Sequence, residues 1–136
     1  MSLIIPDAVE LEVLTALVTP ALTMKLYGNN KTPAHGDTSA GYTEIAGGGY
    51  AAKALTFPNW EIVAGEPTNA VYDTVQNWTF TGILTAPGTI YGYYIVRDSD
   101  NFLMCAERFP VAIVPFSPIE GSIIKILPKL SAQSQF

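Results

Sequence analysis

Residues that could carry out chemistry are few in this chain and lie far apart. His35 is its single histidine and Cys105 its single cysteine. Catalytic zinc sites commonly use two or three imidazoles, and no pair of cysteines is present to replace them. His35 lies in a polar loop. Cys105 lies in an apolar run, where a buried thiol is far more common than a nucleophile. We therefore expect no metal site and no nucleophile-base pair.

Acidic residues suggest two further kinds of chemistry, and the sequence supports neither. The cluster at residues 98–101 lacks the spacing and the distal glutamate of an EF-hand, and a hairpin turn explains its composition. Glu10, Glu12 and Glu44 could be imagined as a general acid and base, but nothing fixes their separation. We expect them to be solvated or to complement a helix dipole. The sequence thus predicts no enzyme and no cofactor.

Aromatic residues leave one binding function open. Trp60, Trp78 and the seven tyrosines could form a platform on which sugar rings stack. At alternating positions in strands, such side chains more often belong to a core or an interface. Both interpretations of the two tryptophans, glycan stacking and core packing, stay open at this point.

Charge and composition exclude several classes of protein. Twelve acidic residues against seven basic ones give a net charge of −5, and no cluster of Lys and Arg favours a nucleic acid as a partner. No run approaches the length of about 18 to 20 apolar residues that spans a membrane, and the start of the chain lacks the positive region of a signal peptide. Only 14% of the residues are charged and 49% are hydrophobic, so we expect partners to cover some apolar surface.

One helix is predicted, at residues 6–17. It begins with a proline and carries three early carboxylates, which suit the positive end of a helix dipole. Its apolar residues, among them Val9, Val13, Leu14 and Leu17, form a surface so broad that something must cover it. Two alternatives remain for what covers it, the domain's own sheet or a neighbouring subunit.

The rest of the chain predicts short strands separated by Gly and Pro turns. Strands are expected at residues 21–27, 50–56, 59–63, 70–72, 77–81, 90–96, 102–106 and 122–127. A proline at position 58 indicates an edge or a corner. Residues 28–49 are expected to form a long loop, in which the triplet Gly47-Gly48-Gly49 provides flexible turn chemistry.

These elements predict a mainly β protein, an antiparallel β-sandwich or barrel-like domain with one short N-terminal helix. We divide the chain into an N-terminal arm and helix (1–20), a β-sandwich domain (21–130) and a C-terminal tail (131–136). Its central element is the hairpin at residues 90–109. The first strand of this hairpin is apolar on both faces, which is typical of a strand covered on both sides by other elements or by a subunit. We expect its tyrosines Tyr91, Tyr93 and Tyr94 to be structural.

Six segments carry a family likeness. They are IIPDAVELEVL (4–14), LTMKLYGNNKTP (22–33), GGGYAAKALTFPNW (47–60), NWTFTG (77–82), IYGYYIVRDSDNFLMCAERF (90–109) and IIKILPKLS (123–131). Together they resemble small β-rich virion structural proteins of tailed bacteriophages, of the capsid decoration (cement) or head-fibre type. Residues 115–121 replace the glycine-rich turn that usually precedes the last strand in that family. The resemblance transfers no catalytic residue.

The resemblance implies a decoration or cement protein that binds the outer capsid surface and stabilises adjacent capsomers. Its expected partners are the major capsid protein and further copies of itself, as a dimer or trimer. Its expected location is the capsid surface of the virion, after synthesis in the host cytoplasm. A fibre, adaptor or tail-associated module that binds a host receptor or glycan is the alternative.

We expect the contacts between subunits in the N-terminal segment and in the long loop, because these lie outside the predicted sheets. The candidate interface residues are Leu3, Ile5, Val9, Val13, Leu17, His35 and Tyr42.

Overall fold

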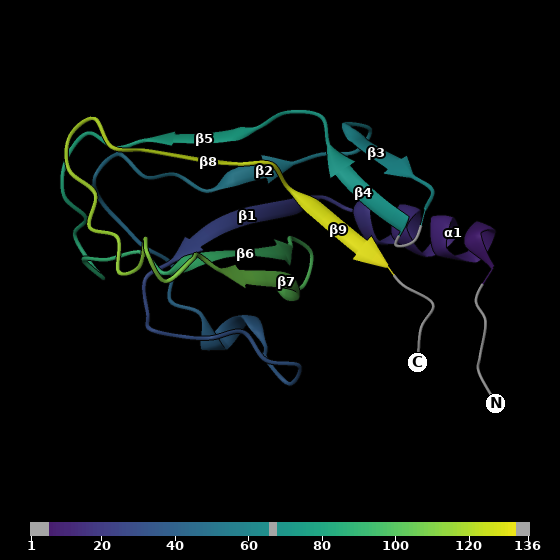
Figure 1. The fold of residues 1–136 in the computed structure, drawn as a ribbon, viewed down its shortest axis with the longest axis horizontal. Coiled ribbons are helices and arrows are strands. Elements are labelled where there is room, and N and C mark those ends of the chain that lie inside the picture. Colours follow the sequence, from purple (N-terminus) through teal and green to yellow (C-terminus); the bar gives the residue numbers. More distant parts are fainter. Residues whose placement is uncertain (1–5, 66–67, 133–136) are drawn as a thin grey trace.

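The computed structural model describes residues 6–65 and 68–132, and strands dominate it (Figure 1). Its elements are α1 (Asp7–Val18), β1 (Leu22–Tyr27), the 3-10 turn η1 (Ser39–Gly41), β2 (Lys53–Leu55), β3 (Trp60–Val63), β4 (Thr68–Tyr72), β5 (Gln76–Thr79), β6 (Gly92–Arg97), β7 (Phe102–Arg108), β8 (Ile123–Ile126) and β9 (Lys129–Ala132). All the strand pairs are antiparallel.

One layer is a four-stranded sheet in the order β2-β1-β6-β7. The predicted hairpin forms its centre and one edge, with β6 pairing β7 from Gly92 opposite Arg108 to Arg97 opposite Phe102. Asn101 lies in the turn with a positive φ of 56°, which its short polar side chain tolerates. The acidic cluster at residues 98–101 therefore forms a hairpin turn.

The other layer is a long bent ribbon with β3 along one part of its edge. β3, β4 and β9 form one sheet, and β5 and β8 form another. Because β4 leads into β5 and β8 into β9, the two sheets follow one another along the same pair of chain segments (Figure 1). Tyr72 N–H donates to the Pro128 carbonyl where they join.

The two layers enclose one apolar core, so the prediction of a mainly β, sandwich-like domain with one N-terminal helix is confirmed. Core side chains come from both layers, among them Met24 and Ile95 from the four-stranded sheet and Trp78 and Leu130 from the ribbon. The turn after Phe57 carries the chain from β2, at the edge of one sheet, to β3, at the edge of the other. Pro58 therefore lies at a corner, as predicted.

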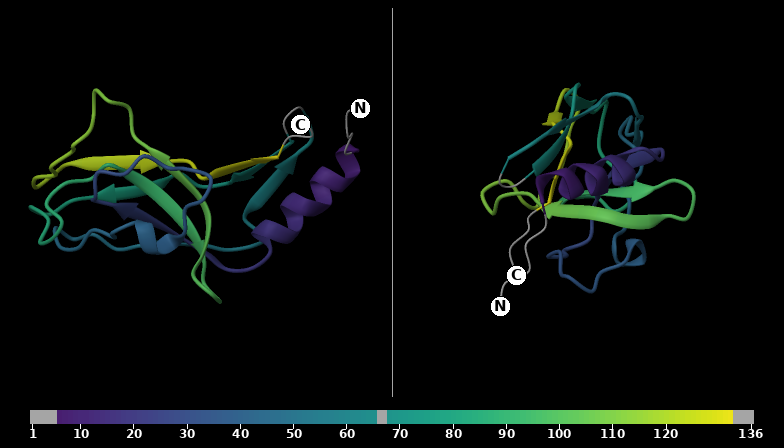
Figure 2. Two further views of the ribbon diagram at one scale, coloured as in Figure 1. Left: turned by 90° about the horizontal axis from the view of Figure 1, so that it is seen from below. Right: turned by 90° about the vertical axis from the view of Figure 1, so that its right-hand side faces the viewer.

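Helix α1 packs on the sheet β3-β4-β9 of its own chain (Figure 2). Leu14 and Val18 are almost fully buried against it. Glu10 lies on the same face and is 3% exposed, with Oε2 accepting a hydrogen bond from the Thr68 hydroxyl at 2.8 Å. Glu10 is therefore not solvated, because the helical period of 3.6 residues aligns position 10 with positions 14 and 18. Its place in the first turn of α1 fits the other role expected for it, which was to complement the helix dipole.

Strand β9 was missed by the sequence analysis, which placed a polar tail at residues 131–136. β9 pairs with β4, from Val71 opposite Lys129 to Thr68 opposite Ala132. Its Leu130 is 8% exposed and belongs to the core. The boundary expected after residue 130 thus falls inside a strand, and the helix at the start of the chain packs against the same sheet as the strand at its end.

The loop at residues 28–49 is draped over the outer face of the four-stranded sheet, below it in Figure 1. It supplies the second cover of β6, whose Tyr93 and Ile95 face the main core while Tyr94 and Val96 face a separate cluster that includes Tyr42. The prediction that this strand is covered on both faces is confirmed.

The glycine triplet that ends this loop forms a turn, as expected, closed by a hydrogen bond from Tyr50 N–H to the Gly47 carbonyl, and this turn is closely packed. Gly47, Gly48 and Gly49 have φ angles of 85°, 61° and 78°, a region that favours glycine. The segment packs closely on residues 81–85, with hydrogen bonds from Thr81 N–H to the Gly48 carbonyl and from Thr85 N–H to the Ala46 carbonyl. The triplet therefore fastens the loop to the domain.

Candidate functional site

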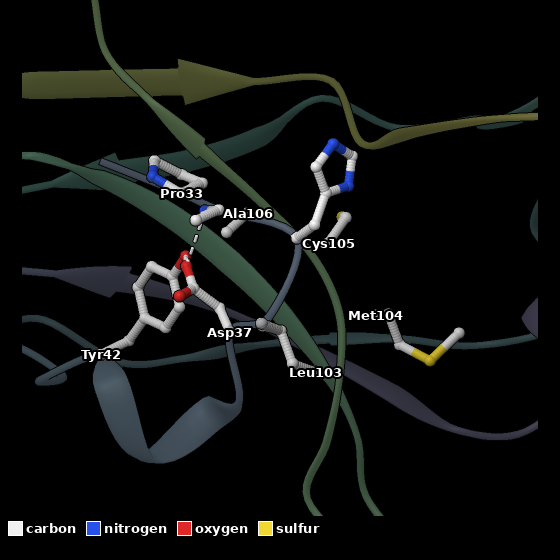
Figure 3. Close-up of a pocket in the computed structure, with 9 residues that line it drawn as sticks. Pro33, Asp37, Tyr42, Leu103, Met104, Cys105 and Ala106 are labelled. Carbon is white, nitrogen blue, oxygen red and sulfur yellow. Dashed lines mark hydrogen bonds between the residues drawn. The ribbon is translucent and has the colours of Figure 1, made fainter. Parts of the chain in front are cut away.

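A pocket of about 420 Å³ lies between the draped loop and strand β7 (Figure 3). It brings together three residues that the sequence analysis singled out, which are His35, Tyr42 and Cys105. The full lining is Pro33, Ala34, His35, Asp37, Tyr42, Leu103, Met104, Cys105 and Ala106. Each of the three must be considered by its environment.

Asp37 is the best-connected side chain of this pocket. Its carboxylate accepts hydrogen bonds from the Ala34 N–H at 2.8 Å and from the Tyr42 hydroxyl at 2.7 Å, and it pairs with Lys31 at 3.0 Å. These donors, the Ala34 N–H first, lower the pKa of Asp37 to about 2. The carboxylate is fully used in holding the loop together, so it serves structure.

Tyr42 lies in the interior and is 6% exposed. Its ring stacks on Tyr94 at a centroid distance of 5.2 Å and meets the edge of Tyr27 at 5.0 Å. Burial and the hydrogen bond to Asp37 raise the pKa of the Tyr42 hydroxyl. The ring therefore offers no surface to a partner, although it was among the candidate interface residues.

Cys105 and His35 both line the pocket, but their environments differ. The Cys105 thiol is partly buried, and burial raises its pKa to about 12, so it is protonated at neutral pH. His35, on the draped loop, is exposed and also lines the pocket. Within residues 6–65 and 68–132, no group of three or more His, Cys, Asp and Glu side chains could hold a metal ion.

The tryptophans lie in the core, which resolves the alternative that the sequence left open. Trp60 is 6% exposed and Trp78 is 3% exposed, and the indole N–H of Trp78 donates to the Ala51 carbonyl at 2.8 Å. Trp60 packs edge-on against Tyr72 at 5.1 Å. Neither ring is available for a sugar to stack on.

A first apolar surface runs along α1. Val9, Val13 and Leu17, spaced by four residues, are 44%, 47% and 37% exposed, and we call these three side chains the α1 stripe. They were all predicted as interface residues, whereas Leu3 and Ile5 of the same prediction lie outside the described residues. The α1 stripe is the part of the helix's apolar surface that the domain's own sheet leaves uncovered.

A second apolar surface was not anticipated. A groove of about 250 Å³ lies between β8 and the segment that follows β7, lined by Phe109, Ile113, Phe116, Ile123, Ile124, Lys125 and Ile126. Its lining residue Ile123 is 53% exposed, and the segment between β7 and β8 carries two further exposed apolar side chains, Val111 at 88% and Ile119 at 65%. We call this surface the β8 groove. The uncharged run at residues 109–119 was the available signal for it in the sequence.

This chain matches no protein-family model, no curated protein and no solved structure. Across the described residues, no helix is both long enough and apolar enough to cross a membrane. The resemblance to phage virion proteins therefore stays a prediction from the sequence, and the two apolar surfaces are the features from which a function must be argued.

Proposed function

We propose that this chain is a structural component of a tailed-phage virion, a decoration or cement protein that docks on the outer capsid surface through helix α1. The observation that carries the proposal is the α1 stripe. Leu14 and Val18 already anchor the helix to the domain, so Val9, Val13 and Leu17 are not needed for that contact. A partner that covers them gains roughly 25 cal/mol for each Å² of apolar surface removed from water.

The charge on α1 indicates which kind of protein surface the stripe fits. Asp7 and Glu12 are exposed beside it, and the helix carries no basic residue. A docking surface on the major capsid protein must therefore combine an apolar centre with Lys or Arg at its rim. Opposite charges at a rim mainly accelerate and orient binding, while the apolar centre supplies most of the affinity.

The alternative, a fibre, adaptor or tail-associated module that binds a receptor or glycan, has less support. Its stacking residues were to be Trp60, Trp78 or loop tyrosines, and both tryptophans are buried, as is Tyr42 of the draped loop. The capsid proposal instead uses three side chains that are exposed.

Particles produced from the genome that encodes this chain test the proposal. We expect an antibody against the protein to label the outer capsid surface in electron micrographs, and the protein to sediment with purified particles. Purified particles that do not contain the protein, or that carry it only on the tail, would contradict the capsid assignment.

A substitution on α1 tests the surface. Val13→Glu places a carboxylate in the middle of the stripe and should reduce binding to particles at least tenfold, which corresponds to about 1.4 kcal/mol. Val75→Glu is the matched control, because Val75 is 49% exposed but lies between β4 and β5, away from α1. Equal binding by both variants would show that the stripe is not the contact.

A further inference from the structure

We propose that the β8 groove is the self-association surface of this protein and that its occupant is a second copy of the chain. The groove and the exposed apolar side chains lie on the segment from Phe109 to Ile126, at the end of the molecule opposite α1 (Figures 1 and 2). A dimer formed there leaves the α1 stripe of both copies free. The proposal thus assigns the two apolar surfaces to two different partners and does not depend on the capsid assignment.

The walls of the groove are apolar on both sides. Phe109, Ile113 and Phe116 form one wall, and β8 forms the other with its three isoleucines. Phe116, Ile124 and Ile126 are only partly buried at the margin of the main core. The groove is therefore a place where the core of the sandwich reaches the surface.

Strand β8 also offers backbone hydrogen-bonding groups. Its described pairing is with β5 alone, and Phe80 N–H donates to the Ser122 carbonyl just before β8 begins. Bonded and non-bonded pairs alternate in an antiparallel ladder, so the backbone groups of Ile123 and Lys125 point away from β5. An uncovered strand edge of this kind can bind a further segment of chain.

Charge identifies a second copy as the occupant. The chain carries a net charge of −5, so two copies repel one another unless their contact avoids the acidic residues. Residues 109–119 contain no charged side chain, and Lys125 is the one charged residue that lines the groove. Glu120, exposed directly after this uncharged run in the sequence, has the opposite sign, and a two-fold axis can place it beside the partner's Lys125. The α1 stripe fails this criterion, because a second copy would bring Asp7 and Glu12 against their own equivalents.

The same segment also carries a side chain able to fill the groove. Val111, at a turn, is 88% exposed, which is more than any other large hydrophobic residue described. A closed two-fold dimer requires each copy to present both a protruding side chain and its complement on one surface. Residues 109–126 meet this requirement, with Val111 of each copy entering the groove between Ile113 and Ile123 of the other.

Sedimentation velocity over a range of concentrations up to about 100 μM tests the proposal on the purified protein without capsids. We expect a reversible dimer of the wild-type chain. Val111→Glu and Ile113→Glu should each raise its dissociation constant at least tenfold. Val63→Glu, at a site on β3 that is 43% exposed against 50% for Ile113, should leave it unchanged. Circular dichroism and thermal melting establish that each variant is folded.

A pair of complementary charges tests the contact itself. Val111→Glu and Ile123→Lys should each dimerise poorly alone, and an equimolar mixture should form a heterodimer at least tenfold more tightly than either variant forms a homodimer. A wild-type monomer at every concentration overturns the proposal. So does a dimer that survives both glutamate substitutions, one that Val63→Glu weakens equally, or a mixture that associates no better than its components.

Discussion

Individual residues of the draped loop hold it in shape and attach it to the four-stranded sheet. Asp37 joins the Ala34 N–H, the Tyr42 hydroxyl and Lys31, and Tyr42 in turn stacks on Tyr94 of the sheet below. A polar network therefore holds the loop in shape, while an aromatic contact holds it to the sheet. The printed contacts of Asp37 and Tyr42 lie within the loop and between the loop and the sheet, so both side chains contribute to the fold.

Tyr42→Phe should raise the pKa of Asp37 from about 2 towards its ordinary value, because one of its hydrogen-bond donors is lost while the ring stays stacked. The pKa of Asp37 is lower in the folded chain than in the unfolded chain, so its stabilising effect is complete above about pH 4 and is lost as the pH falls towards 2. The variant should therefore lose less stability than the wild type over that interval.

Carbon-13 NMR titration of the Asp37 carboxyl measures this change, and urea unfolding at pH 6 and pH 3 measures the effect on stability. Tyr93→Phe is the matched control, since its hydroxyl donates to Glu107 at 2.8 Å and not to Asp37. An unaltered Asp37 titration in Tyr42→Phe would mean that the hydroxyl does not contribute.

At the scale of elements, the same kind of segment takes different roles according to what packs on it. Helix α1 has apolar residues on two sides. Leu14 and Val18 lie in the core, and the α1 stripe (Val9, Val13 and Leu17) lies on the surface. The loop before β2 is largely irregular, yet the β6 side chains beneath it, Tyr94 and Val96, are only 4% and 2% exposed. Hydrogen bonds at the glycine triplet attach the loop to residues 81–85.

Gly48→Ala should destabilise the fold by roughly 1–3 kcal/mol. Gly48 has a φ of 61°, and a Cβ placed there would lie 2.7 Å from the Gly82 carbonyl oxygen. Gly36→Ala is the control, because a Cβ at position 36 meets no atom within 4 Å. Urea denaturation curves of the two variants give the comparison, and equal stability would mean that the triplet does not fasten the loop.

For the whole molecule, the important contact joins the two ends of the chain. Helix α1 packs against β3, β4 and β9, so residues more than a hundred positions apart meet at one end of the apolar core. Contacts of this sequence separation cost loop-closure entropy before they contribute stability. The helix and the last strand should therefore be stable only together.

Leu130→Ala should cost about 2–4 kcal/mol, because it leaves a cavity beside α1 and β4. Its effect should spread to the helix. Hydrogen exchange should show faster exchange of the amides of α1 and β4, with those of β6 and β7 affected least. Lys129→Ala, exposed on the same strand, should change little. Protection of α1 that is unaltered in Leu130→Ala would show that the helix is held without β9.

Local patterns determined much of this architecture. The helix at residues 6–17, the turn at residues 97–101 and most of the strands follow from periodicity and from turn residues, both of which act over a few neighbours. The apolar character of both faces of β6 also predicted that it would be covered twice. Strand β9 escaped prediction because four residues between a proline and a polar end carry too short a pattern.

Only the tertiary structure decided which apolar and polar side chains remain at the surface. Val13 and Leu14 are neighbours of similar character, yet the sheet covers one and leaves the other exposed. Burial likewise removed Tyr42, Trp60 and Trp78 from the candidate binding residues and placed Glu10 in the interior. The β8 groove arises because β8 and residues 109–116 come together across the fold. Exposure depends on contacts between distant segments, and no local pattern in the chain records them.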